Sequence, residues 1–115
     1  MALLDIQTDR GTAKGGGVGM TVTDLHWAAI NHYGNVPNMI KAVEEMAELT
    51  QMLCKRVTGD ACDMDHLREE IADVGIMIER LTLIFGPARV AEVREQKLKR
   101  LAGRLGLDEK EADAP

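Results

Sequence analysis

The chain has 115 residues, of which 45% are hydrophobic, and it carries a net charge of −5. This length predicts a single domain, and the composition supplies enough apolar surface for a modest core. The acidic balance argues against nucleic-acid binding, and no stretch reaches the roughly 18 consecutive apolar residues of a membrane span. Charges at Asp5, Asp9 and Arg10 interrupt any signal peptide. We therefore expect a cytoplasmic protein with no membrane or nucleic-acid partner.

Both ends of the chain are predicted to lack stable structure. Residues 1–20 contain five glycines and no sustained apolar period, which favours a flexible arm. The run lacks the Gly-Lys-Ser/Thr ending of a phosphate-binding loop. Residues 106–115 are mostly polar and acidic, as in a disordered tail. The folded domain is thus expected to span residues 21–105.

The first predicted helix takes Thr21 or Thr23 as its N-cap and ends at Tyr33. It holds Trp27, the only tryptophan of the chain. An aromatic residue at helical spacing packs in a core or an interface more often than it stacks on a nucleobase, and both roles stay open for Trp27. The histidines of this helix have no evident partner in the sequence.

The second predicted helix follows Pro37 and runs from Asn38 to about Thr58. Its apolar residues fill an arc of roughly 180° on a helical wheel. One antiparallel neighbour and one flanking helix cover about 100° to 140° of such an arc. The expected fold is therefore all-α, with antiparallel helical hairpins that form a four-helix bundle completed by oligomerisation.

The third predicted helix begins near Asp63 or Asp65 and ends at Phe85. Glu70 falls inside its apolar stripe. An ionised carboxylate in such a place costs on the order of several kcal/mol unless a cation or hydrogen-bond donors compensate it. A salt bridge and a bound metal ion are the two explanations.

Two acidic pairs, each spaced i, i+3, lie on these two helices: Glu45 with Glu48, and Glu70 with Asp73. An i, i+3 spacing places both carboxylates of a pair on one helix face. If the helices fold back at Gly59 as an antiparallel hairpin, residues whose numbers sum to 118 lie level with each other. Each acid of one pair then faces an acid of the other. Four carboxylates at one height repel one another unless a cation binds among them, which favours the metal.

The two cysteines, Cys54 and Cys62, flank the predicted turn. So few cysteines in a chain of intracellular character predict free thiols rather than a disulfide. Cys62 and His66 are spaced i, i+4, but zinc needs two further nitrogen or sulfur ligands and only Cys54 is near. A zinc site is therefore disfavoured.

The fourth predicted helix opens at Pro87 and runs to about Leu105. Three of its cations, Lys97, Arg100 and Arg104, follow each other at i, i+3 and i+7 and form a basic ridge. A solvated charged face explains such a ridge, because cations are favoured near a helix C-terminus. Phosphate binding is the alternative.

The charge is distributed unevenly along the chain. Residues 39–73 contain nine acids and four bases, whereas residues 87–105 contain six bases and two acids. An acidic hairpin and a basic helix suit a metal ion and a phosphorylated ligand held between them.

The order of these motifs, Glu-x-x-Glu, a 21-residue gap and Glu-x-x-Asp on consecutive helices, resembles the MazG-like superfamily of all-α nucleoside triphosphate pyrophosphohydrolases. Residues 41–49 and 69–74 look like the two signature helices of that family. Residues 97–100 on the last helix also look like those of its small single-domain members. The resemblance covers about residues 24–104, and two motifs together are more specific than either alone.

This resemblance implies that Glu45, Glu48, Glu70 and Asp73 bind Mg²⁺, with Mn²⁺ as a possible substitute. It also implies hydrolysis of an NTP or dNTP to the monophosphate and pyrophosphate, for nucleotide pool control or the clearing of damaged nucleotides. The chemistry is consistent, because Mg²⁺ prefers oxygen ligands and is normally shared between carboxylates and substrate phosphates.

Further roles in such a site follow from residue type. Glu44 or Glu48 is the candidate to orient or deprotonate the attacking water, although Glu44 leaves its helix about 100° away from Glu45. Lys97 and Arg100 are the candidates for the phosphates, and Trp27 is a candidate substrate-binding residue.

Two positions depart from the family pattern. Asn38 stands where small members often carry Gln, and Met77 stands where some branches carry a polar or aromatic residue that helps to hold the nucleotide. The base preference therefore stays open. The alternatives are a phosphoribosyl-ATP pyrophosphatase of the same superfamily and a non-catalytic helical oligomerisation module. A pure scaffold gains nothing from carboxylates that repel one another. In each case we expect a homo-oligomer, a dimer or a tetramer.

Overall fold

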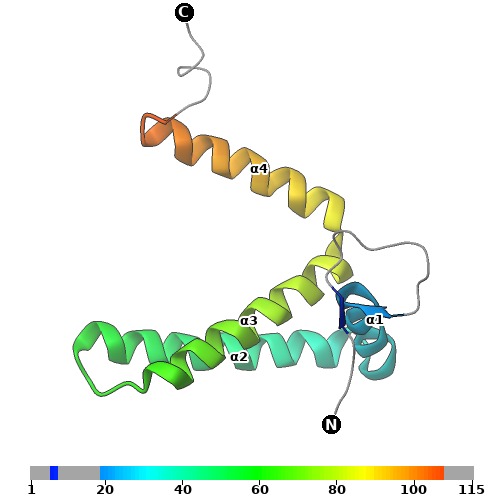
Figure 1. The fold of residues 1–115 in the computed structure, drawn as a ribbon, viewed down its shortest axis with the longest axis horizontal. Coiled ribbons are helices and arrows are strands. Elements are labelled where there is room, and N and C mark those ends of the chain that lie inside the picture. The colour runs from blue at the N-terminus through cyan, green and yellow to red at the C-terminus, as the bar shows by residue number, and fades with distance from the viewer. Residues whose placement is uncertain (1–5, 8–18, 108–115) are drawn as a thin grey trace, which may run out of the picture. The chain divides into compact units, whose positions relative to one another are not determined.

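The structure is a computed structural model that describes residues 6–7 and 19–107. These residues form four helices and one pair of short strands (Figure 1). The helices are α1 (Val22–Tyr33), α2 (Asn35–Thr58), α3 (Met64–Phe85) and α4 (Pro87–Arg104). The predicted all-α class is confirmed. In the described part of the chain, no helix is long and apolar enough to cross a membrane.

A reciprocal pair of hydrogen bonds fixes the start of α1. The Thr21 hydroxyl accepts a bond from the Asp24 N–H at 3.0 Å, and the Asp24 carboxylate accepts one from the Thr21 N–H at 3.1 Å. This capping box satisfies donors that have no partner inside the helix. Thr21, rather than Thr23, is thus the N-cap.

The start of α2 lies one turn before the predicted position. The sequence places it at Asn38, whereas the helix begins at Asn35, directly after Gly34. Pro37 lies inside the first turn. The N–H groups of a first turn have no intrahelical acceptor, so a proline there removes no helical hydrogen bond. The predicted start lies too far along the chain because the prediction treats Pro37 as the residue that precedes the helix.

Helices α2 and α3 form the antiparallel hairpin that the sequence predicts (Figure 1). Gly59 ends α2 with φ 88°, in the left-handed region that favours glycine, and the next N–H bonds to the Lys55 carbonyl at 2.9 Å. Asp63 then caps α3, because its carboxylate accepts bonds from the backbone N–H groups of Asp65 and His66 at 2.9 and 3.3 Å.

Strands β1 (Ile6–Gln7) and β2 (Met20–Thr21) pair in parallel, with Ile6 opposite Met20. Residues 6–7 and 20 belong to the segment predicted as a flexible arm, so part of this arm is paired with the start of the first helix. The remainder of the arm up to residue 18, and residues 108–115 of the predicted tail, lie outside the described residues.

The core formed by α1, α2 and α3 is small. Its buried apolar residues are Ile30, Ala42, Met52, Leu67 and Met77, and none of the large side chains in the described ranges is completely buried. Three polar residues are buried beside them, namely His26, Asn38 and Glu70. A buried polar group destabilises the fold unless it has a hydrogen-bond partner, so each of these three residues needs one.

The chain divides into two compact units, residues 1–84 and 85–115. The second unit contains α4, of which no residue is buried. One side of α4 is apolar, with Val90, Val93 and Leu98 among its residues, and the basic ridge is exposed.

The turn of the hairpin provides a test of the fold. Replacing Gly59 by Ala should lower the free energy of unfolding by roughly 1–2 kcal/mol, because a Cβ is disfavoured at positive φ. Urea denaturation at fixed protein concentration measures this change. Gly59→Asn is the matched control and should cost less, since Asn enters the left-handed region more readily. Equal stability of Gly59→Ala and the wild type would contradict the assigned turn.

Candidate metal centre

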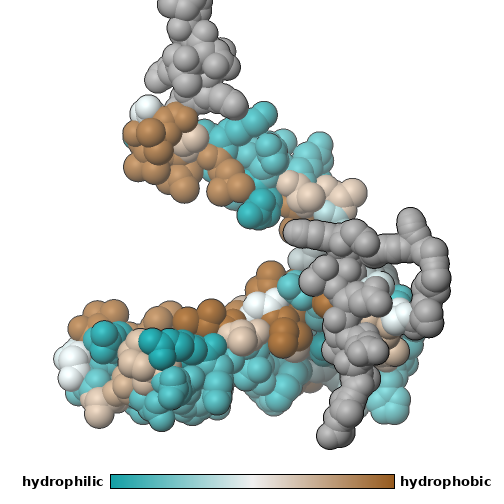
Figure 2. All heavy atoms as spheres, in the orientation of Figure 1, coloured by the Kyte–Doolittle hydropathy of each residue, from teal (hydrophilic) through white to brown (hydrophobic). Residues whose placement is uncertain are grey.

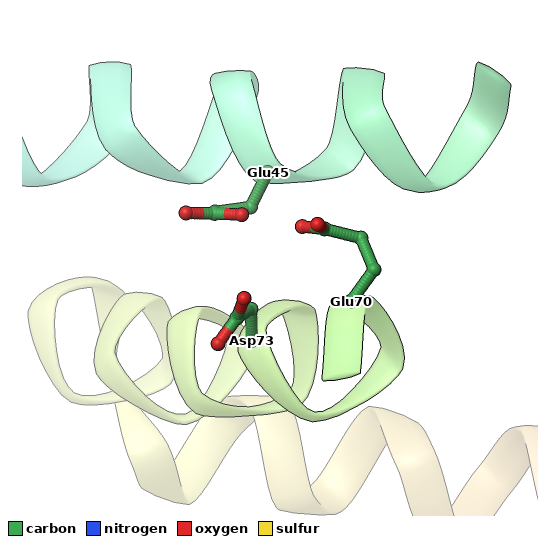
Figure 3. Close-up of side chains that lie close together, drawn as sticks. All are labelled: Glu45, Glu70 and Asp73. Atoms are coloured by element: carbon green, nitrogen blue, oxygen red, sulfur yellow. The ribbon is translucent and has the colours of Figure 1, made fainter. Parts of the chain in front are cut away.

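Three carboxylates converge between α2 and α3. Glu45 extends from α2, and Glu70 and Asp73 extend toward it from α3 (Figure 3). One carboxylate oxygen of each residue lies within 4.8 Å of the others. We call these three residues the carboxylate cluster.

The register of the hairpin explains this convergence. Glu45 and Asp73 belong to the pairs whose numbers sum to 118, and they meet as that rule predicts. Glu70 precedes Asp73 by about one helical turn and therefore leaves α3 on the same face. Ala42 and Met77, which lie near the cluster on the same helix faces, are buried, so the cluster lies along the seam between the two helices.

Glu70 is the residue in the most unusual environment. The residue is only 5% exposed, and its Oε2 atom is buried without a hydrogen-bond partner among the described residues. A hydrogen bond with Glu45 raises the pKa of Glu70 to about 7, and burial and the charges of Glu45, Asp73 and Glu48 act in the same direction. Without a cation, Glu70 therefore holds a proton well above the usual range of a carboxylate.

Glu45 shows the opposite shift. Hydrogen bonds from Glu70 and then from Lys41 lower the pKa of Glu45. The Lys41 ammonium lies 3.0 Å from Glu45 Oε2, one turn before it on α2. The lysine is exposed, so this ion pair adds little stability. Its effect is to place one positive charge at the border of the cluster.

The geometry suits a hard cation. An octahedral Mg²⁺ with metal–oxygen distances of about 2.1 Å holds its ligand oxygens about 3 to 4.2 Å apart. The oxygens of the cluster lie within 4.8 Å, so small side-chain rotations bring them into this range. A bound cation would also give the buried Oε2 of Glu70 the partner it lacks.

Glu48, the fourth predicted ligand, lies outside the cluster. Its side chain is exposed, but its charge still contributes to the raised pKa of Glu70. Repulsion between like charges favours this separation while no cation binds. Glu44 is also exposed, and its charge acts on Lys41 rather than on the cluster.

The other predicted site residues lie on different elements. Trp27 is on α1, with 42% of its surface exposed. Lys97 and Arg100 are exposed on α4, in the second unit. Their roles stay predictions.

A second group of polar residues, which the sequence did not reveal, joins α1, α2 and α3. The Arg80 Nε donates to His26 Nδ1 at 3.2 Å, and the Arg80 Nη1 donates to Asn38 Oδ1 at 3.0 Å. The other ring nitrogen of His26 lies 3.0 Å from Glu79 Oε1. We call Glu79, His26, Arg80 and Asn38 the buried polar chain, after its two buried members, His26 and Asn38; Arg80 is half-buried and Glu79 is exposed. It links residues more than 40 positions apart.

The register of the hairpin could have predicted one contact of the buried polar chain from the sequence. Asn38 and Arg80 also sum to 118, so the register that aligns the acids places them level as well. His26 has no comparable signal, because its partners are 53 and 54 positions away on another helix. Only the packing of α1 identifies them.

The pKa of Glu70 gives a prediction for the metal-free protein. The folded state binds this proton more tightly than the unfolded state, whose ordinary pKa is 4.5. The stabilising contribution is therefore complete below pH 4.5 and is lost as the pH rises through about 7. In EDTA, the melting temperature of the wild type should fall across this interval relative to that of Glu70→Gln.

Glu69→Gln is the control for this experiment, because it removes the same charge from an exposed neighbour. Its melting profile should parallel the wild type. Parallel profiles for the wild type and Glu70→Gln would show that Glu70 is not held in the described environment.

We compared the chain with protein-family models, with curated proteins and with solved structures, and none of the three comparisons gave a match.

Proposed function

We propose that the protein is a Mg²⁺-dependent nucleoside triphosphate pyrophosphohydrolase, which converts an NTP or dNTP to the monophosphate and pyrophosphate. The observation that carries this proposal is the buried carboxylate of Glu70, which has one oxygen without a hydrogen-bond partner among the described residues and converges with the carboxylates of Glu45 and Asp73. When all three carboxylates are ionised, such an arrangement destabilises a protein unless a cation binds there. The two acidic motifs on consecutive helices add the resemblance to this enzyme superfamily.

The residues of the cluster have distinct tasks in this proposal. Glu45, Glu70 and Asp73 would hold the cation, and its binding would displace the proton from Glu70. Mg²⁺ would supply positive charge for the phosphate oxygens and the leaving group. The buried position of Glu70 restricts its side-chain motion, so it fixes the site relative to α3.

The reaction needs a water molecule aligned with the bond that breaks. Water attacks the α-phosphorus, the bond from this phosphorus to the bridging oxygen breaks, and pyrophosphate leaves. Glu48 is assigned to orient this water and accept its proton, because it is exposed and level with Glu70. Glu44 is the second candidate. Lys97 and Arg100, on α4, stay the sequence-based candidates for binding phosphate.

Two alternatives use the same chain differently. A phosphoribosyl-ATP pyrophosphatase would need the same metal and the same type of bond cleavage, so a panel of substrates distinguishes it. An oligomerisation module would have no use for a buried carboxylate oxygen without a hydrogen-bond partner, which disfavours it.

Exposed apolar residues support a homo-oligomer as part of the proposal. Val36, Ile40 and Val43 follow one stripe of α2 and are 58%, 54% and 61% exposed. Ile71 and Ile78 on α3 are 52% and 46% exposed. Figure 2 shows hydrophobic side chains gathered along an edge of the hairpin. Patches of this kind usually mark interfaces, and pairing of two hairpins would form a four-helix bundle.

Amide substitutions test the metal ligands. Glu70→Gln or Asp73→Asn should lower kcat/KM for the hydrolysed triphosphate by at least about a hundredfold, because each removes a ligand charge at nearly constant volume. The assay incubates the protein with Mg²⁺ and ribo-, deoxy- and modified triphosphates, and separates pyrophosphate from orthophosphate.

Helix content, measured by circular dichroism, should not change in these variants, and Glu69→Gln should keep full activity. Activity of Glu70→Gln at the wild-type level would refute the assignment of the site.

The oligomer has its own test. Light scattering at micromolar concentration should give two or four times the chain mass of 12.6 kDa. Val43→Asp should shift the protein toward the monomer, because it places a charge in the apolar stripe. Gln51→Asp, at an exposed polar position of the same helix, is the control. A wild-type mass of a single chain would exclude the bundle of two hairpins.

A further inference from the structure

Arg80 lies two helical turns beyond Asp73 on α3. Seven residues correspond to about 700°, only about 20° short of two full turns, and to a rise of about 10.5 Å. The two side chains therefore leave α3 in nearly the same direction. On α2, Asn38 precedes Glu45 by the same seven residues. The Asn38–Arg80 level thus follows the Glu45–Asp73 level along one seam of the hairpin.

The charge along this seam changes from negative to positive. Lys41 lies between the two levels, with its Nζ 3.0 Å from Glu45 Oε2. Arg80 follows at the end next to α1, where it bonds to His26. A ligand that begins at a cation in the carboxylate cluster would meet two positive side chains in this direction.

The guanidinium of Arg80 is held by neutral groups. His26 Nδ1 accepts a bond from Arg80, so its ring proton is on Nε2, which donates to Glu79. Asn38 accepts through Oδ1, while its Nδ2 donates to the carbonyls of Gly34 and Ala29 at 2.7 and 3.2 Å. These bonds fix the direction of every member of the buried polar chain.

No carboxylate in the described ranges lies within ion-pair distance of Arg80. Glu79 acts only through the His26 ring, and its side chain is 61% exposed, so water screens its charge. The described hydrogen bonds use Nε and Nη1 of Arg80, which leaves the Nη2 donors available. Arg80 is thus a half-buried, permanent cation with no direct counter-ion.

We infer that Arg80 binds the pyrophosphate part of the substrate, with the α-phosphate at the carboxylate cluster and Lys41 between them. This inference rests on the proposed function. A phosphate supplies the negative charge that Arg80 lacks, and a guanidinium offers a second edge for it. A nucleobase would supply only another neutral acceptor, of which Arg80 already has three: His26 Nδ1, Asn38 Oδ1 and the Met77 sulfur.

The test measures binding of inorganic pyrophosphate and of a nucleoside monophosphate by calorimetry, both in Mg²⁺. Arg80→Gln should weaken pyrophosphate binding about ten- to a hundredfold, the equivalent of one hydrogen bond to a charged group. Affinity for the monophosphate should not change. Arg68→Gln is the matched control, since it removes the same charge from an exposed position of α3 and should alter neither affinity.

Because Arg80 also links three helices, its substitution can disturb the fold. If Arg80 had a purely structural role, its substitution would weaken the binding of both ligands together. This result would overturn the inference. Unchanged pyrophosphate binding, a loss confined to the monophosphate, or a wild type that binds no pyrophosphate would overturn it too. If Arg80→Gln does not fold, the same binding measurements are made with Arg80→Lys. It keeps the charge without the planar fork and should weaken pyrophosphate binding selectively.

The outcome is separable from that of the proposed function. Turnover of triphosphates together with normal pyrophosphate binding by Arg80→Gln would refute the inference alone. A selective loss of pyrophosphate binding in a protein that hydrolyses none of the triphosphates would support the inference and refute the proposed reaction.

Discussion

The carboxylate of Glu70, buried between two helices, is the constraint on which the α2–α3 hairpin depends. The fold places this side chain against Glu45 and near Asp73, although like charges repel and burial disfavours ionisation. In the metal-free protein, a proton on Glu70 relieves this conflict. In the proposed enzyme, a cation would relieve this repulsion. The packing that aligns the two helices would then also favour cation binding.

The small core explains why this hairpin suits an oligomer. A helix pair with α1 at one end buries only a few apolar residues, and much of the apolar arc of α2 remains exposed. Burying apolar surface contributes about 25 cal/mol of favourable free energy per Å², so such a surface favours association. In the proposed enzyme, the polar seam would have to stay open to solvent, because a triphosphate would have to reach the carboxylate cluster. Under this proposal, association would use the apolar stripes of the hairpin, and ligand binding would use the seam.

The buried polar chain connects α1 with the α2–α3 hairpin. His26 and Asn38 are nearly inaccessible, and each is satisfied by a partner on another helix. Satisfied buried groups of this kind define one packing arrangement rather than many. They attach α1 to the hairpin and hold Arg80 in one orientation, two turns from the carboxylate cluster. A flexible arginine in that place would lose more conformational entropy when an anion binds.

The sequence by itself determined the helices and the level of the acids. Capping residues such as Thr21, the glycine at position 59 and the helical period of the apolar residues act locally, and the register rule that pairs Glu45 with Asp73 needs only a turn position. Tertiary structure decided which carboxylates converge, since Glu45, Glu70 and Asp73 meet while Glu48 stays in solvent. It also decided the partners of His26, which lie on another helix 53 and 54 residues away. Burial and such distant contacts depend on how helices pack, and packing is a property of the whole chain rather than of any local segment.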